Sequence, residues 1–84
     1  MATHLQLYTR PFCGFCSRVV RFLKQYDIQL EQKNIWTDKD AAEELLAGGG
    51  RTTVPCLRIR DDSGKVRWMY ESSDIIDYLK TALL

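Results

Sequence analysis

The first third of the chain changes from strand-like to helical spacing of its apolar residues. Leu5–Tyr8 alternates weakly between apolar and polar positions, which predicts a short strand. After a loop that contains Pro11, apolar residues recur at i, i+3, i+4 and i+7 starting from Cys16. This spacing predicts a helix over residues 14–26. Ile28–Asn34, which follows Asp27, is predicted to be a second strand.

The middle of the chain predicts a helix followed by a β-hairpin. Thr37 is the expected N-cap of this helix, and Gly48–Gly50 is expected to end it. Val54–Arg60 and Lys65–Tyr70 are predicted strands on either side of a Gly-containing turn at residues 61–64. Two strands joined by such a turn are typical of a hairpin.

The C-terminal segment predicts a last helix and completes the fold class. Ser72 or Ser73 is the expected N-cap. The apolar stripe of this helix is expected to be Ile75, Ile76, Leu79 and Leu83. The element order is then β-α-β-α-β-β-α, with a parallel first crossover and an antiparallel hairpin. We therefore expect an α/β fold, a four-stranded mixed sheet with helices on both faces.

Composition and length limit the class of protein. The 84 residues, 45% of them apolar and 27% charged, are expected to form one globular domain over residues 1–84. No apolar stretch is long enough to span a membrane, and Met1–His4 has no signal-peptide pattern. A net charge of +1 indicates no nucleic-acid partner. Three cysteines, an odd number, favour a reducing compartment, so we expect a cytoplasmic location.

The charges are distributed unevenly along the chain. All eleven acidic residues lie from Asp27 onward, whereas residues 1–26 carry only Arg10, Arg18, Arg21 and Lys24. These cations are either the solvated face of the first helix or a basic rim that attracts acidic partners. Both interpretations stay open.

The motif Cys13-Gly14-Phe15-Cys16 places two thiols where the first strand ends and the first helix begins. Unsatisfied N–H groups and the positive end of the helix favour a thiolate there. Cys16 lies about one turn further along, close enough to attack a mixed disulfide on Cys13. We therefore expect Cys13 to be an exposed nucleophile and Cys16 a more buried resolving thiol.

Other interpretations of the three cysteines remain. The Cys13–Cys16 pair could be half of a zinc site completed by Cys56 and His4, although these two lack paired spacing. The pair could also be purely structural. Cys56 is either an inert, semi-buried thiol or a third redox-active one.

Two further motifs accompany the cysteine pair, and together the three resemble the glutaredoxin family. They are Thr53-Val54-Pro55 and the helix start Ser72-Ser73-Asp74. The resemblance implies a thioredoxin fold with strand order 2-1-3-4, a cis Pro55 facing Cys13, and glutathione as reductant. The segment Tyr70–Ile75 also looks like the amino-terminal domain of glutathione transferases.

The resemblance implies a set of site residues. Cys13 and Cys16 would be catalytic. The implied glutathione-binding residues are Arg10, Phe15, Thr53, Val54, Pro55, Glu71, Ser72 and Ser73. In this set Arg10 meets the glycine carboxylate, the Val54 backbone pairs with the peptide as an added strand, and Ser72 and Ser73 bind the γ-glutamyl carboxylate.

The implied activity is glutathione-dependent reduction of disulfides and glutathione mixed disulfides in proteins, carried out by a monomer with no resident metal. Gly14 stands where the common family motif has proline, as it does in single-cysteine glutaredoxins. The alternative is therefore a carrier in which Cys13 of two chains and two glutathiones hold a [2Fe–2S] cluster.

Overall fold

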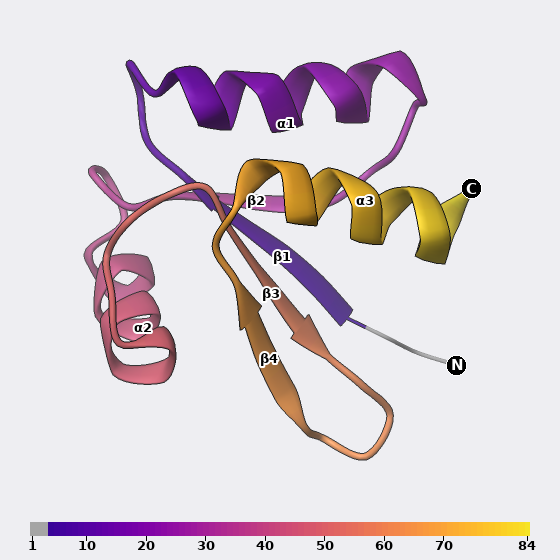
Figure 1. The fold of residues 1–84 in the computed structure, drawn as a ribbon. Helices are drawn as coiled ribbons and strands as arrows, with labels where there is room; N and C mark the ends of the chain where they lie inside the picture. Colours follow the sequence, from indigo (N-terminus) through magenta and orange to yellow (C-terminus); the bar gives the residue numbers. More distant parts are fainter. Residues whose placement is uncertain (1–3) are drawn as a thin grey trace.

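Four strands form one mixed sheet in the order β2-β1-β3-β4. The computed structural model describes residues 4–84, and Figure 1 shows α1 and α3 together on one side of the sheet, with α2 at the other. This arrangement confirms the predicted fold class and the predicted strand order. The elements are β1 (His4–Thr9), α1 (Gly14–Gln25), β2 (Glu31–Asn34), α2 (Lys39–Gly49), β3 (Cys56–Arg60), β4 (Val66–Met69) and α3 (Ser72–Leu83).

The register of β1 fixes which side chains face each side of the sheet. β1 runs parallel to β2, with Gln6 opposite Glu31, and antiparallel to β3, with Tyr8 opposite Cys56. Successive side chains of a strand point to opposite faces. Leu7 therefore faces α1 and α3, whereas Gln6 and Tyr8 face the side of α2.

The main core lies between the sheet and the pair α1 and α3. Helical spacing on α1 and α3 and alternation on β1 and β3 bring apolar residues to this one face. The buried residues of this core are Leu7, Val19, Phe22, Leu23, Leu57, Ile59, Ile75 and Leu79. Among residues 4–84, none of the helices is long and apolar enough to cross a membrane.

A smaller core lies between the sheet and α2, and it includes the hydroxyl of Tyr8 and the thiol of Cys56. Its buried members are Tyr8, Ala41, Leu45 and Cys56. The Tyr8 hydroxyl donates a hydrogen bond of 3.2 Å to Glu44 of α2. Burial, followed by the charge of Glu44, raises the pKa of Tyr8 to about 12. Trp68 and Tyr70 pack at the edge of this core.

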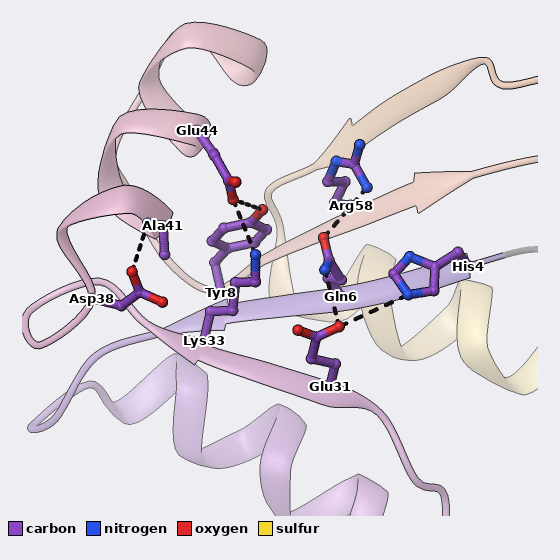
Figure 2. Close-up of polar contacts among 9 residues, drawn as sticks. All are labelled: His4, Gln6, Tyr8, Glu31, Lys33, Asp38, Ala41, Glu44 and Arg58. Carbon is purple, nitrogen blue, oxygen red and sulfur yellow. Dashed lines mark hydrogen bonds and ion pairs between the residues drawn. The ribbon is translucent and has the colours of Figure 1, made fainter.

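Beyond α2, the same face of the sheet carries a polar network (Figure 2). The Gln6 side chain donates to Glu31 at 3.0 Å and accepts from Arg58 at 3.3 Å, so one amide links three strands. Lys33 donates to Glu44 at 3.1 Å and ties β2 to α2. The Gln6 amide is thus paired with Glu31 and Arg58, and Lys33 is paired with Glu44, on the face of the sheet opposite α1 and α3.

The predicted second strand was too long at its start. The backbone N–H of Ile28 donates to the carbonyl of Leu23, and Asp27 has a left-handed φ of 54°. This is the arrangement that closes the C-terminal end of a helix. Because Ile28 is used to end α1, the chain joins the sheet only at Glu31.

The N-caps of α2 and α3 differ from the predicted ones. The Asp38 carboxylate, rather than Thr37, caps α2 by accepting from the N–H of Ala41 at 3.1 Å. Thr37 belongs instead to the turn that follows β2, where its N–H donates to Asn34. The N-cap of α3 is Glu71, which makes no capping hydrogen bond with its side chain. The prediction that Ser72 or Ser73 caps this helix was therefore wrong.

Three smaller differences concern the hairpin and the last helix. β3 begins at Cys56 because Pro55 has no N–H to donate to a neighbouring strand. β4 is shorter by one residue at each end than predicted. In the predicted stripe of α3, Ile75 and Leu79 are fully buried and Ile76 is half-buried, but Leu83 is exposed in the last turn.

Candidate active site

Cys13 is positioned by the start of α1 and by the segment that precedes β3. It is the N-cap of α1, and its Sγ accepts a hydrogen bond of 3.2 Å from the N–H of Cys16. Its thiol also donates to the carbonyl oxygen of Val54 at a distance of 3.8 Å. The first contact places a backbone donor against the sulfur, an arrangement that stabilises negative charge on it.

The two motif cysteines are both buried. Cys13 is 7% exposed and Cys16 is 3% exposed, and both are free thiols. The expectation of an exposed Cys13 was therefore wrong, although Cys13 is the more accessible of the two. The reason is the chain at Val54, whose carbonyl contacts the Cys13 thiol and limits the approach of solvent.

Cys16 is held as a neutral thiol. Burial is the main cause that raises its pKa to about 12, and its hydrogen bond with Cys13 adds to the shift. Cys16 is therefore protonated across the physiological pH range. This fits a thiol that reacts second, after a disulfide has formed next to it.

The Val54–Pro55 peptide bond is cis, as the resemblance implied. A groove of about 230 Å³ opens beside this bond. Its lining residues come from the start of α1, from the loop before β3 and from the start of α3, and they are Phe15, Arg51, Thr53, Val54, Pro55, Tyr70, Glu71 and Ser72. The fold thus brings six of the predicted binding residues together, from three separate segments.

Two predicted binding residues, Arg10 and Ser73, do not line the groove. Ser73 is exposed on the first turn of α3. The Arg10 guanidinium donates to the carbonyl oxygens of Pro11 and Phe12 at 3.0 and 3.1 Å. It also lies 5.5 Å from the ring centroid of Trp36. Arg10 is therefore turned to the other side of the Cys13 loop.

Arg51 and Tyr70 line the groove and were missed as candidates. The Arg51 guanidinium stacks 4.2 Å from the centroid of the Tyr70 ring, and the Tyr70 hydroxyl donates to the Arg51 carbonyl at 3.1 Å. Gly49 has no space for a side chain because a Cβ there would collide with the Tyr70 hydroxyl. The signal in the sequence was a lone cation between the glycines that end α2 and the Thr53-Val54-Pro55 motif.

A second hollow of about 360 Å³ lies along α1 and shares no lining residue with the groove. Three cations surround it, namely Arg10, Arg21 and Lys24, and among residues 4–84 no acidic side chain lines it. Three of the four cations in residues 1–26 therefore gather around this hollow, which runs along α1.

Cys56 lies behind the groove, on the side of the sheet that α2 covers. It is fully buried, and burial raises its pKa to about 12. A hydrogen bond with Tyr70 partly opposes that shift. The inert interpretation of Cys56 fits this environment. Among residues 4–84, no group of three or more His, Cys, Asp or Glu side chains is arranged to hold a metal ion.

Solved structures with the same fold include proteins of different activities. The thioredoxin-like protein BC3987 matches with a TM-score of 0.65 and 23% identity, over 87% of this chain and 96% of that one. Glutaredoxin C1 from Populus tremula x tremuloides, in its holo form, matches with a TM-score of 0.65 and 21% identity, over 93% of this chain and 75% of that one.

A larger protein contains a similar fold as one part. Maleylacetoacetate isomerase from Anaeromyxobacter dehalogenans 2CP-1, solved with glutathione bound in the active site, has a TM-score of 0.69 and 24% identity. The match covers 95% of this chain but only 38% of the isomerase. At these identities the likeness establishes the fold alone.

The family follows from the sequence match. No curated protein sequence matches the chain. The family model described as Glutaredoxin matches residues 5–63, which include the cysteine pair, the cis-proline segment and the first strand of the hairpin. With this match over most of the chain, we conclude that the protein belongs to the glutaredoxin family.

Proposed function

We propose that the protein is a glutathione-dependent thiol–disulfide oxidoreductase, with Cys13 as nucleophile and Cys16 as resolving thiol. The observation that carries the proposal is the position of the Cys13 sulfur. It lies between a helix-start N–H and the carbonyl of Val54, a residue that lines the groove of about 230 Å³. A nucleophilic sulfur beside a peptide-binding groove is what mixed-disulfide exchange requires.

The chemistry proceeds by exchange of disulfide bonds. The Cys13 thiolate attacks the glutathione sulfur of a mixed disulfide, a Cys13–glutathione bond forms, and the substrate thiolate leaves and takes a proton from solvent. A second glutathione then attacks that bond, releases oxidised glutathione and restores Cys13. With a protein disulfide, the Cys13 thiolate attacks one sulfur, and Cys16 then loses its proton and attacks the bond on Cys13, which releases the protein as a dithiol. Two glutathiones reduce the resulting Cys13–Cys16 disulfide and leave as oxidised glutathione.

The groove offers each end of glutathione a suitable partner. The Val54 backbone can pair with the peptide as an added strand. Ser72, buried at the start of α3, can receive the γ-glutamyl carboxylate near the positive end of the helix, and Glu71 can receive its amino group. Arg51 supplies a planar cation for the glycine carboxylate. The isomerase of the same fold, which binds glutathione in its active site, supports this use of the groove.

The wider setting is proposed with the activity. We propose that its protein substrates carry disulfides or glutathione mixed disulfides and that it works as a monomer in the cytoplasm. Its charge distribution and its described helices give no reason to propose a nucleic-acid or membrane partner.

The test is reduction of the mixed disulfide of glutathione and cysteine, coupled to glutathione reductase. Wild type should turn over, and Cys13→Ser should fall to background while remaining folded by circular dichroism. Cys16→Ser should keep this activity but lose most of its activity on a protein disulfide. A Cys13→Ser variant that retains turnover would contradict the proposal.

Gly14 supports the second candidate, the shared [2Fe–2S] cluster. A Cβ added at Gly14 would meet no atom within 4 Å, so the position beside Cys13 is open. Two chains would each contribute Cys13, with two glutathiones as the remaining ligands. Anaerobic reconstitution tests it, because a brown dimer would support the cluster and a colourless monomer would exclude it.

A further inference from the structure

Two aromatic side chains stand exposed beside Cys13, outside the groove. Phe12 is 92% exposed and Trp36 is 59% exposed, and their ring centroids are 6.4 Å apart. Phe12 immediately precedes the nucleophile, whereas Trp36 comes from the loop between β2 and α2. We refer to this pair as the Phe12–Trp36 platform. Trp36 thus packs against Phe12 at the surface.

The platform is held in place rather than left loose. Phe12 has a φ of 57°, a backbone conformation that aromatic residues rarely adopt. The Arg10 guanidinium donates to the Phe12 and Pro11 carbonyls, and it stacks on the Trp36 ring. One cation therefore fixes the Phe12 backbone and the Trp36 ring together, and presents both rings to solvent.

The surface next to the platform is positive. Arg10, Arg21 and Lys24 surround the hollow of about 360 Å³, which no acidic residue of the described part of the chain lines. Arg18 is exposed on the same helix. The apolar and the basic parts meet at Arg10, which belongs to both.

We infer that this surface docks polypeptide substrates in which the target cysteine has an apolar neighbour and acidic residues follow. The inference rests on the proposed function and names its substrate class. An apolar side chain laid on the platform removes both rings from water. Acidic residues complement the cations, and the residues of the platform and of the basic hollow differ from those that line the groove. The platform should therefore raise the affinity for protein substrates and leave the affinity for small disulfides unchanged.

The covalent step is the one already described. With glutathione in the groove, Cys13 attacks the glutathione sulfur, the bond to the peptide sulfur breaks, and the peptide thiolate departs and is protonated. Contacts with the peptide act before that step, through the affinity for the substrate. They should therefore change kcat/KM for peptides and leave the identity of the nucleophile unchanged.

The test uses four glutathionylated peptides that combine Phe or Ser before the cysteine with two Asp or two Lys after it. Each rate is divided by the same enzyme's rate on the glutathione–cysteine mixed disulfide. Phe12→Asn and Trp36→Ser remove one ring each, and asparagine tolerates the left-handed backbone at residue 12. Arg21→Glu reverses one charge, and Arg60→Glu is the matched control on β3.

Wild type should favour the Phe peptides and the Asp peptides, each by about five- to tenfold. Phe12→Asn and Trp36→Ser should lose only the Phe preference. Arg21→Glu should lose only the Asp preference, which should also fall with added salt. Equal wild-type rates on all four peptides, or preferences that survive every variant, would overturn the inference. A wild type inactive on the small mixed disulfide would instead contradict the proposed function, and the inference with it.

Discussion

The Sγ atom of Cys13 lies 3.8 Å from the carbonyl oxygen of Val54, a residue 41 positions further along the chain. This contact joins the cysteine at the start of α1 to the cis-proline segment, which lines the groove. Neither residue alone specifies a redox site. Their juxtaposition brings the Val54 backbone next to the Cys13 sulfur, and the proposed function rests on this contact.

Selective alkylation should distinguish the three thiols. Burial raises the pKa of both Cys16 and Cys56 to about 12, and only thiolates react well with iodoacetamide. At pH 8 we expect carboxamidomethyl groups on Cys13 alone, with Cys16 and Cys56 modified only as the pH approaches 11. Peptide mapping by mass spectrometry measures this, and the urea-unfolded chain, alkylated at all three positions, is the control. Equal labelling of native Cys13 and Cys56 at pH 8 would refute the assignment.

The fold should lose stability in alkali. The pKa of Cys56 is about 12 in the folded chain, against an ordinary value of 9.0. Between these values the unfolded state releases a proton that the folded state retains, so the free energy of unfolding falls as pH rises. Cys16 and Tyr8 act in the same direction.

Thermal unfolding from pH 7 to 11 measures this loss. We expect Tm to be flat up to about pH 8 and then to fall, with 1 kcal/mol corresponding to about 4–8 °C in a domain of this size. Cys56→Ala should fall less steeply above pH 9 because it lacks one of the shifted thiols. Identical slopes for Cys56→Ala and wild type would show that Cys56 ionises alike in both states.

The two candidate caps of α2 can be compared directly. Asp38→Ala should destabilise the protein by about 1 kcal/mol, because its carboxylate accepts the N–H of Ala41. Thr37→Ala should cost much less, since its side chain makes only a long contact of 3.5 Å with the Asn34 carbonyl. Urea denaturation of both variants tests the pair, and a larger loss for Thr37→Ala would favour the cap predicted from the sequence.

Under the proposed function, either Arg51 or Arg10 would bind the glycine carboxylate of glutathione. Arg51 lines the groove and Arg10 does not. Arg51→Ala should therefore raise KM for glutathione about tenfold, the effect of losing one charged contact, while Arg51→Lys recovers part of it. Arg10→Ala should raise KM less. Steady-state kinetics at varied glutathione concentration measures both KM values. A larger increase in KM for Arg10→Ala than for Arg51→Ala would identify Arg10 as the cation that binds glutathione.

The sequence predicted elements well where one periodic pattern acted alone. The helical spacing from Cys16 gave α1 nearly to the residue, because the apolar stripe that forms the helix also buries it. The sequence-based predictions were wrong where a backbone N–H group had two possible hydrogen-bond partners. Ile28 closes α1 instead of entering β2, and Asp38 outcompetes Thr37 for the first turn of α2.

The candidate site was predictable as a set of motifs but not as a surface. The motifs supplied Cys13, Val54 and Ser72, which the fold gathers at one place. The direction of a long side chain depends on neighbours that the local sequence does not reveal. Arg10 turns to Trp36, whereas Arg51 lies against Tyr70 and faces the groove. The burial of Cys13 similarly depends on a segment 41 residues away.

The most direct test of the central claim is to trap the intermediate. Cys16→Ser is incubated with oxidised glutathione, quenched in acid and examined by intact-mass and peptide-mapping mass spectrometry. The account predicts one glutathionyl group per chain, located on Cys13, and removed by added glutathione. A chain that carries the group on Cys56, or that acquires none while folded and reduced, would contradict Cys13 as the nucleophile of a glutathione-dependent oxidoreductase.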